Sequence, residues 1–393
     1  AAAVTAVTAV TAPFPTAWWP AATAATAATG SPRPPTARTA APVVTVALAV
    51  PVAACSAPAV TAAGPATVVQ AATAPPGVVI DHHPGKTQQY IGSPSIAIVP
   101  GGAYVASHDF FGKGSTQSTS AVTRVFRSTD RGKTWTKTAE FSDQFWSNLF
   151  VHRGRLYLMG TTYEYGRIVI RRSDDGGVSW SQPSMLTEDT GYHTAPVPMA
   201  YKDGRIWRGF EWHPQGKWGF FEAFLISASV KADLMDPKSW TKSERMRYPK
   251  DLAGEGEHWL EGNAIVDRQG HLLDILRVAA IEKAAIVRLK DGKFEWEGLV
   301  PFPGGAKKFT IRWDKKSKKF WTLSNPALEK YEKSAKDPAS VRNTLALMSS
   351  PDLRHWTMER IVLEHPDVEK HAFQYVDWQF DGKDLIVASR TAF

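Results

Sequence analysis

One repeating unit runs through most of this sequence and restricts the folds open to it. An apolar strand, a short polar turn and a second apolar strand with a polar end follow one another six times. Strand-forming residues on both sides of short polar turns, most of which contain glycine, are typical of β-hairpins. The hairpins pair residues 95–99 with 104–109, 147–151 with 156–163, 195–201 with 205–212, 261–266 with 271–278, 309–313 with 320–325, and 373–380 with 384–390.

The spacing of these hairpins predicts the fold. They recur at intervals of about fifty residues, as the four-stranded blades of a β-propeller do. Helical periodicity is almost absent between them, which argues against a parallel α/β fold. We therefore expect an all-β, six-bladed β-propeller over residues 77–393, a length sufficient for one large hydrophobic core.

The first 76 residues differ in composition from the rest. They are almost entirely Ala, Thr, Val and Pro, and they contain no Asp, Glu or Lys. Such a stretch cannot bury enough apolar surface to offset the entropy that it would lose on ordering. We expect residues 1–76 to be disordered or removed, so that the folded domain starts near residue 77.

The same stretch contains a pattern that indicates export. Arg33 and Arg38 precede an apolar run at residues 43–52, an order that resembles a secretory signal peptide. Residues 52–55 also resemble a bacterial lipobox, in which the cysteine, here Cys55, carries a lipid. The sequence thus predicts an exported protein that is periplasmic, extracellular or anchored at the cell surface.

The charge and cysteine content restrict the kinds of partner, metal and cofactor that this chain can be expected to bind. The formal net charge is +8, but Lys and Arg are interleaved with Asp and Glu, and no nucleic-acid-binding motif occurs. Cys55 is the only cysteine, which excludes a disulfide framework and a cysteine metal site. No ligand spacing indicates a metal, and no cofactor is expected, although a structural Ca²⁺ would leave no readable pattern. We expect a monomer without a transmembrane segment.

Turns between the hairpins carry a second motif. Residues 128–135 and 173–180 both read S-x-D-x-G-x-[ST]-W, and residues 350–356 hold a degenerate copy. In such a turn the Asp accepts main-chain hydrogen bonds, the Gly adopts a positive φ and the Trp packs under a neighbouring strand. The motif resembles the Asp box (BNR repeat) of the sialidase, or neuraminidase, superfamily. Its role is structural, on the outer part of a blade.

This resemblance covers about residues 90–393 and implies an activity as well as a fold. Sialidases are exo-acting glycoside hydrolases that remove a terminal anionic sugar, sialic acid being the family default, from a glycan or oligosaccharide. They use a Tyr nucleophile assisted by a Glu, an Asp acid/base, and three Arg that bind the substrate carboxylate. A neutral phenol suits this substrate because a carboxylate nucleophile would be repelled by the carboxylate of the sugar.

Candidate site residues follow first from the hairpins themselves. The innermost strands of a propeller converge on a central funnel, so polar residues at their ends can form a site. Those residues are His108, Asp109, Tyr163, Glu211, Arg277, Asn325 and Arg390.

The resemblance then implies roles for particular residues. Glu261 precedes the fourth hairpin and Arg277 ends it, as the catalytic Glu and the second Arg do in sialidases. Arg342 opens the strand before the third Asp-box-like turn, as the third Arg does. Tyr375 begins the segment Tyr-Val-Asp-Trp at residues 375–378, which is similar to the segment of the nucleophile. The resemblance therefore implies a catalytic pair of Tyr375 and Glu261, with Arg277 and Arg342 binding the substrate.

The chain departs from sialidases on the first blade. Gly-Ser-Pro at residues 92–94 stands where the family has Arg-Ile-Pro, so the first Arg is missing. Residues 114–120, where the Asp acid/base is expected, contain no acid. The nearest candidates for the proton donor are His108 and Asp109.

A third departure lies on the last hairpin. Where sialidases have a Glu that braces the first Arg, this chain has Arg390. We expect Arg390 to rebuild the anion site together with Arg277 and Arg342, facing Tyr375. The alternative is that Arg390 only pairs with an acid such as Asp377 or Asp384.

Two other functions stay open at this point. Related propeller enzymes act on rhamnose joined to glucuronic acid, by hydrolysis or by lyase elimination, with a histidine of the first blade in a key role, and His108 fits that description. The third hypothesis is a carbohydrate-binding propeller without activity, in which Tyr375 has a packing role and Arg277 and Arg342 form ordinary ion pairs.

Overall fold

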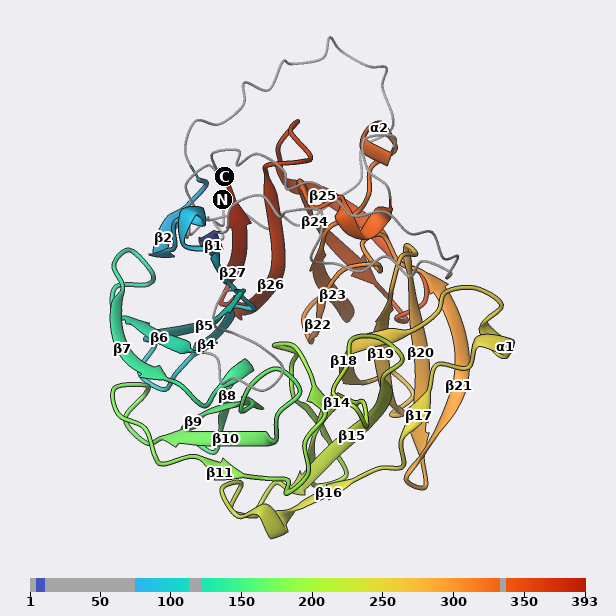
Figure 1. The fold of residues 1–393 in the computed structure, drawn as a ribbon, viewed down its shortest axis with the longest axis horizontal. Helices are drawn as coiled ribbons and strands as arrows, with labels where there is room; N and C mark the ends of the chain where they lie inside the picture. The colour runs from blue at the N-terminus through green and yellow to red at the C-terminus, as the bar shows by residue number, and fades with distance from the viewer. Residues whose placement is uncertain (1–4, 11–74, 113–121, 333–336) are drawn as a thin grey trace, which may run out of the picture.

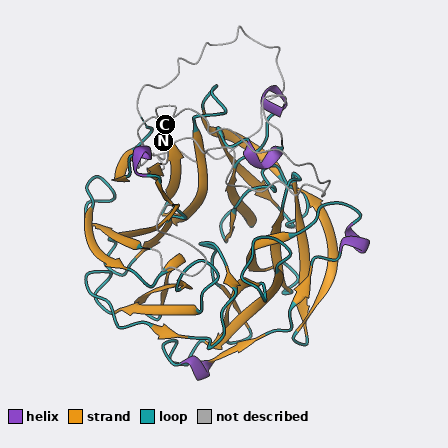
Figure 2. Ribbon diagram, viewed as in Figure 1, coloured by secondary structure: helices purple, strands orange, loops and turns teal. Residues whose placement is uncertain are grey.

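The computed structural model describes residues 5–10, 75–112, 122–332 and 337–393. These residues form 27 β-strands and only short helical segments: α1 (Lys250–Ala253), α2 (Glu329–Glu332), and 3-10 turns at Gly85–Thr87, Pro237–Ser239 and Pro338–Ser340. Figure 2 shows the strands arranged as sheets around a common centre, with the short helices in the peripheral loops. The fold of the described residues is an all-β propeller.

Five blades are built from strands that are consecutive in the chain. The first contains β3 (Gln89–Ile91), β4 (Ser95–Ile98), β5 (Tyr104–Gly112), β6 (Thr123–Ser128) and β7 (Thr136–Phe141), and the second β8 (Phe145–His152), β9 (Arg155–Thr161), β10 (Ile168–Ser173) and β11 (Ser184–Met185). The third contains β12 (Tyr192–His193), β13 (Ala200–Lys202), β14 (Arg205–Trp212), β15 (Glu222–Ser229), β16 (Trp240–Lys242) and β17 (Met246–Arg247). The fourth contains β18 (Trp259–Val266), β19 (Leu272–Val278), β20 (Lys283–Lys290) and β21 (Lys293–Pro301), and the fifth β22 (Thr310–Asp314), β23 (Lys319–Ser324), β24 (Thr344–Ser350) and β25 (Thr357–Glu364).

The last hairpin, β26 (Ala372–Asp381) and β27 (Asp384–Ala392), is completed differently. Its sheet has the order β2-β1-β27-β26, with β1 (Thr5–Val10) and β2 (Val78–His82) supplied from the amino-terminal part of the chain. Six blades formed entirely by residues 77–393 were expected, and this is corrected: five are formed in that way. The physical reason is that the open edge of β27 exposes main-chain N–H and C=O groups, which β1 satisfies by pairing in parallel with it.

Contacts near the centre join the last hairpin to the first blade. The Asp377 carboxylate on β26 accepts hydrogen bonds from the Ser95 hydroxyl at 2.7 Å and from the Ile96 N–H at 3.0 Å. The Ser95 Oγ in turn accepts from the Leu149 N–H of the second blade at 2.9 Å. The innermost strands, among them β4, β8, β18, β22 and β26, therefore surround one central region (Figure 1).

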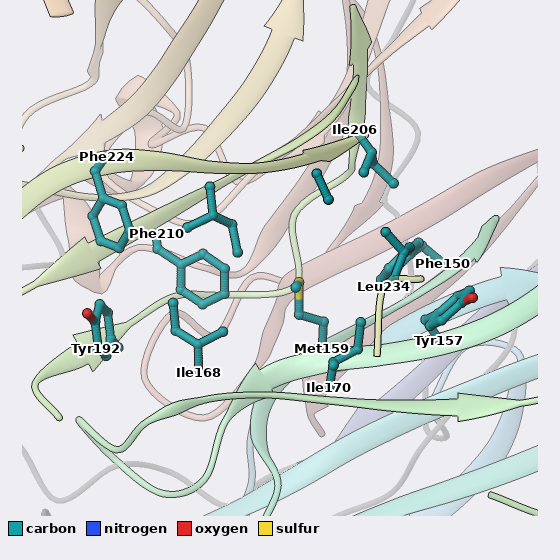
Figure 3. Close-up of a cluster of buried hydrophobic side chains, with 12 residues drawn as sticks. Phe150, Tyr157, Met159, Ile168, Ile170, Tyr192, Ile206, Phe210, Phe224 and Leu234 are labelled. Carbon is teal, nitrogen blue, oxygen red and sulfur yellow. The ribbon is translucent and has the colours of Figure 1, made fainter. Parts of the chain in front are cut away.

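The core lies between the blades. Figure 3 shows the largest such cluster, in which Met159, Ile168 and Ile170 of the second blade face Ile206 and Phe210 of the third. Each fully buried side chain of this kind contributes about 1.5–3 kcal/mol relative to an exposed one. Apolar layers thus hold neighbouring blades together, and the polar strand ends are left at the centre.

The Asp-box-like segments form turns between the outer strands of their blades. Asp130 Oδ1 accepts hydrogen bonds from the N–H groups of Lys133, at 3.0 Å, and Thr134, at 2.9 Å. Asp175 holds the second turn in the same way. These carboxylates are used to stabilise turns away from the centre of the propeller, as the motif predicts.

Candidate functional site

The ends of the hairpins place the candidate residues at one end of the propeller. In an antiparallel hairpin the first strand begins where the second strand ends. Leu260 at the start of β18 therefore lies opposite Arg277 at the end of β19, and Gln374 lies opposite Arg390 in the last hairpin. Glu261 and Tyr375, next in the chain after Leu260 and Gln374, lie at this same end.

Three innermost strands are distorted at the same place. The pairing register shifts across residues 145–148 in β8, 260–263 in β18 and 374–377 in β26. Each bulge holds one residue other than glycine at positive φ, namely Trp146 at 44°, Glu261 at 59° and Tyr375 at 56°. This conformation is strained for such residues, and bulges of this kind re-aim a side chain beside active sites. The repeated strain marks this end of the propeller as the candidate site.

Tyr375 lies among three buried arginines. The Arg390 guanidinium carbon is 4.1 Å from the centroid of the Tyr375 ring, and that of Arg342 is 5.5 Å from it. Both guanidiniums donate to the Gln374 side-chain oxygen, Arg390 at 2.9 Å. Tyr375 and the arginines, Arg277 included, are at most 8% exposed. The structure therefore brings Arg277, Arg342 and Arg390 together around Tyr375.

Arg277 links Glu261 to this cluster. Its Nη1 donates to Glu261 Oε2 at 2.8 Å, and both side chains are buried. Burial by itself would lower the pKa of Arg277, but the Glu261 carboxylate and the Tyr375 side chain raise it. The arrangement is a charged guanidinium between a carboxylate and a phenol.

Two buried lysines add to the positive charge, and sequence reasoning missed them. Lys307 Nζ donates to Glu282 Oε1 at 2.6 Å, and Lys308 Nζ donates to the Thr310 hydroxyl at 2.6 Å and the Val376 carbonyl at 2.7 Å. Burial lowers the pKa of each lysine to about 8. Their position directly before a buried strand was the available signal, but lysines usually lie on the surface.

The cluster carries an excess of buried positive charge. Burial lowers the pKa of Arg390 to about 10 and also lowers that of Arg342. These shifts show that the charged guanidiniums are less well stabilised here than in water. A bound anion would offset that cost.

The first blade explains why an arginine is missing there. A Cβ atom on Gly92 would lie 2.2 Å from Asp109 Oδ1, so a larger residue at this position would require the Asp109 side chain to move. Asp109 itself accepts hydrogen bonds from the Ser93 N–H at 2.5 Å and, through its other oxygen, from the Trp146 N–H at 3.0 Å. Burial raises the pKa of Asp109. This carboxyl braces the bulge of the second blade, so its position is that of a structural group.

His108 lies on the other face of β5 from Asp109, because neighbouring strand residues point in opposite directions. Its Nε2 lies 2.9 Å from Asp81 Oδ2 and its Nδ1 lies 3.2 Å from the Asp109 carbonyl oxygen. Asp81 also accepts from Arg124 Nη1 at 3.0 Å. The expected place of His108 at the centre is therefore corrected: the structure places it in an ion-pair group with β2 and β6.

The ion pairs of Asp81 with His108 and Arg124 predict how the free energy of unfolding depends on pH. Burial would raise the pKa of Asp81, but His108 and Arg124 together lower it from 3.8 to about 2. A carboxylate with a lowered pKa stabilises the fold above its unfolded-state value, and this stabilisation is lost as the pH falls through the folded value. Asp81→Asn should therefore lower the free energy of unfolding by about 1–2 kcal/mol at neutral pH, allowing for solvent screening. The difference from wild type should shrink between about pH 4 and pH 2 in urea titrations. A difference that stays constant over that range would contradict the ion pair.

The opposite side of the site is aromatic and acidic. His193 Nδ1 lies 2.8 Å from Glu211 Oε2, and the other Glu211 oxygen accepts from the Gly262 N–H at 2.9 Å. The His193 ring centroid is 4.5 Å from that of Trp146 and 4.6 Å from that of Phe221. Glu211, a candidate from the sequence, thus links the bulges of the second and fourth blades through His193.

Asn325 and Tyr163, two further candidates from the hairpin ends, have structural contacts. Asn325 donates from its side-chain nitrogen to the Thr344 carbonyl at 2.7 Å and to the Phe373 carbonyl, so it fastens strands together. The main-chain carbonyl of Tyr163 accepts from the Gly166 N–H at 2.9 Å in the turn after β9.

Some expectations concern residues outside the described ranges. Cys55 and the segment 114–120 both lie there. Within the described ranges, no group of three or more His, Cys, Asp or Glu side chains is placed to hold a metal ion. The helices described here are all too short or too polar to cross a membrane.

Comparisons with known proteins bear on the fold. No protein-family model and no curated protein matches the chain. Among solved structures, Trypanosoma rangeli sialidase in complex with sialic acid matches with a TM-score of 0.52 and 14% identity over 81% of this chain. The same sialidase with the inhibitor DANA matches with a TM-score of 0.51 and 13% identity over 80% of this chain. Both matches cover 54% of that sialidase, so the chain spans about half of its length.

A Penicillium chrysogenum α-L-arabinanase complexed with arabinobiose also matches, with a TM-score of 0.48 and 12% identity, over 77% of this chain and 92% of that one. At these identities the comparisons concern the fold alone. The two sialidase matches support a β-propeller fold.

Proposed function

We propose that this protein is a carbohydrate-active enzyme, and specifically an exo-acting glycoside hydrolase of sialidase type that cleaves a terminal sugar bearing a carboxylate. The observation that carries the proposal is the set of three buried guanidiniums gathered around Tyr375, at a position where the backbone is strained. Sialic acid is the default substrate, and the protein acts outside the cytoplasm.

The arginines account for the choice of an anionic sugar. A guanidinium presents a planar fork of N–H donors that matches a carboxylate, which an ammonium does not. Arg277, Arg342 and Arg390 come from three different blades, so they surround a small anion from several directions. Lys307 lies close enough to Arg277 and Arg342 for their charges to lower its pKa, after the larger effect of burial. This positive field selects for a negative substrate.

Tyr375 and Glu261 supply the chemistry in this proposal. The Tyr375 oxygen bonds to the reacting sugar carbon while its proton passes to the Glu261 carboxylate. The glycosidic C–O bond breaks as this bond forms, and its electron pair leaves on the oxygen of the departing group, which takes up a proton. The nearby guanidiniums stabilise the phenolate that develops, as an adjacent positive charge does for any acidic group. Water later attacks the same carbon and releases the sugar from Tyr375.

The last hairpin matters for this site because it carries Tyr375 and Arg390. We propose that the sheet β2-β1-β27-β26 serves as a sixth blade that completes the propeller. Ala9 of β1 pairs with Arg390 of β27, so this sheet holds the strand on which the arginine lies.

Removing Arg390 tests the anion site. Arg390→Ala should lower kcat/KM for a carboxylate-bearing substrate about tenfold or more, since a factor of ten corresponds to about 1.4 kcal/mol of lost transition-state binding. The same variant should change kcat/KM much less for an uncharged analogue of the same sugar. Steady-state kinetics on the matched pair measure both values. Equal losses on the two substrates would rule out a direct role of Arg390 in carboxylate binding.

A side-by-side screen tests the function as a whole. The purified protein should release fluorophore from a fluorogenic sialoside and leave a rhamnosyl-glucuronate disaccharide intact. Cleavage of the disaccharide alone would favour the rhamnosyl-glucuronate enzyme instead. Binding of sugar acids without turnover of either substrate would identify a carbohydrate-binding propeller.

A further inference from the structure

Two of the arginines in the site share one hydrogen-bond acceptor. Arg342 and Arg390 both donate to the side-chain oxygen of Gln374, Arg390 at 2.9 Å. The orientation of this amide follows from its neighbours, because a guanidinium can only donate and the oxygen is the part of an amide that accepts. Gln374 is 1% exposed, so bulk water does not replace these bonds. One buried oxygen therefore holds two guanidiniums beside the Tyr375 ring.

Backbone contacts fix Gln374 relative to both arginines. Gln374 on β26 lies directly opposite Arg390 on β27 in the last hairpin. The preceding residue, Phe373, donates from its N–H to the Arg342 carbonyl at 2.9 Å. The Arg342 Nε in turn donates to the Ala339 carbonyl at 2.8 Å. The two guanidiniums thus take their relative positions from an acceptor that is itself held in place.

The shared acceptor is uncharged, although a carboxylate of nearly the same shape would bind two guanidiniums more strongly. Burial lowers the pKa of Arg390 to about 10, and the Arg342 guanidinium beside it acts in the same direction. A carboxylate at this position would offset the repulsion between these two cations. It would also weaken the attraction of the site for any other anion. The amide orients the guanidiniums and leaves their charge in place.

We propose that Gln374 is a positioning residue that sets the specificity of the site for an anionic sugar, an inference that rests on the proposed function. Its oxygen holds Arg342 and Arg390 for the substrate carboxylate, and its neutrality leaves both positive charges to the substrate. The stability that a carboxylate would add here is given up in exchange for binding, as at other functional sites.

The variant Gln374→Glu tests the importance of the neutral charge. It keeps the acceptor oxygen, and no native bond is lost, because the Gln374 Nε2 has no hydrogen-bond partner among the described residues. The two guanidiniums should keep the new carboxyl ionised. Calorimetric unfolding should show a Tm about 3 °C or more above wild type, since two buried cations gain a partner. Isothermal titration should show affinity for N-acetylneuraminic acid about tenfold or more below wild type. Its uncharged methyl ester should bind both proteins alike.

Two further variants separate orientation and charge from folding. Gln374→Met stays neutral but removes the acceptor, so both the Tm and the affinity for the acid should fall, the affinity about tenfold. Because the two Gln374 variants should change the Tm in opposite directions, a loss of affinity in both cannot come from unfolding. Gln269→Glu makes the same change of charge at an exposed turn of the fourth hairpin, and it should leave both values at those of wild type.

The outcomes separate this inference from the proposed function. If Gln374→Glu binds the acid as tightly as wild type, or loses acid and ester equally, Gln374 does not set the charge specificity, and the proposed function stands. Unchanged affinity in Gln374→Met would refute the positioning role in the same way. A lower Tm for Gln374→Glu would show that the two guanidiniums do not share this acceptor in solution. A wild-type protein that binds the acid no more tightly than the ester would overturn the proposed function and the inference with it.

Discussion

Tyr375→Phe should lower kcat about a thousandfold while the protein stays folded. Only the hydroxyl is lost, so the phenyl ring keeps its place under the Arg390 and Arg342 guanidiniums. Without the nucleophile the arginines still bind the substrate, and KM should change much less than kcat. Steady-state kinetics on a fluorogenic sialoside measure both constants, and thermal unfolding followed by circular dichroism checks the fold.

Tyr201→Phe is the matched control for this change. Tyr201 is an exposed tyrosine on β13, beside the turn of the third hairpin and far along the strands from the bulges. The Tyr201→Phe variant also loses only a hydroxyl, and its kcat should equal that of the wild-type protein. Unchanged turnover in both variants would mean that Tyr375 has only a packing role and would refute the proposed nucleophile.

The second large effect is on stability. Arg277→Met should lower the free energy of unfolding by about 3–5 kcal/mol, because it leaves the Glu261 carboxylate buried without its charged partner. Both side chains are at most 3% exposed, so water cannot replace the lost interaction. Urea denaturation at neutral pH measures the change. The combined variant with Glu261→Gln should recover part of the loss, since it removes the buried charge as well.

Arg288→Met provides the comparison for this experiment. Arg288 pairs with Glu295 at 2.6 Å on the surface of the fourth blade, where solvent screens the charges. Its removal should leave the free energy of unfolding nearly unchanged. Equally small losses for Arg277→Met and Arg288→Met would show that the Glu261–Arg277 pair is not buried in solution as the structure has it.

The hairpins could be predicted from sequence because the information for them is local. Alternating strand residues around glycine turns define each pair of strands, and the structure has a hairpin at every expected position. The ends of these hairpins then led to Arg277 and Arg390, and the resemblance to sialidases added Glu261 and Tyr375. Antiparallel pairing places all four at one end, since it brings a strand start beside a strand end. For these residues, position along the chain was enough to predict a shared place in the fold.

Other features depended on contacts that no local pattern encodes. The sequence alone could not decide which of His108 and Asp109 faces the centre, because the two neighbours on a strand differ only in direction. A side chain in place of Gly92 would meet Asp109, a contact made by strand pairing. Lys307 and Lys308 are buried because of partners contributed by other segments, Glu282 and Val376.

What the sequence determined by itself was the set of hairpins, the all-β class and the residues at the strand ends, because each depends on neighbours within one hairpin. Only the tertiary structure decided which distant segments contact these hairpins. Strand β1 covers the open edge of the last hairpin, and Glu282 and Val376 accept hydrogen bonds from the buried Lys307 and Lys308. Both depend on packing between segments far apart in the chain, where burial and charge are set by the whole fold.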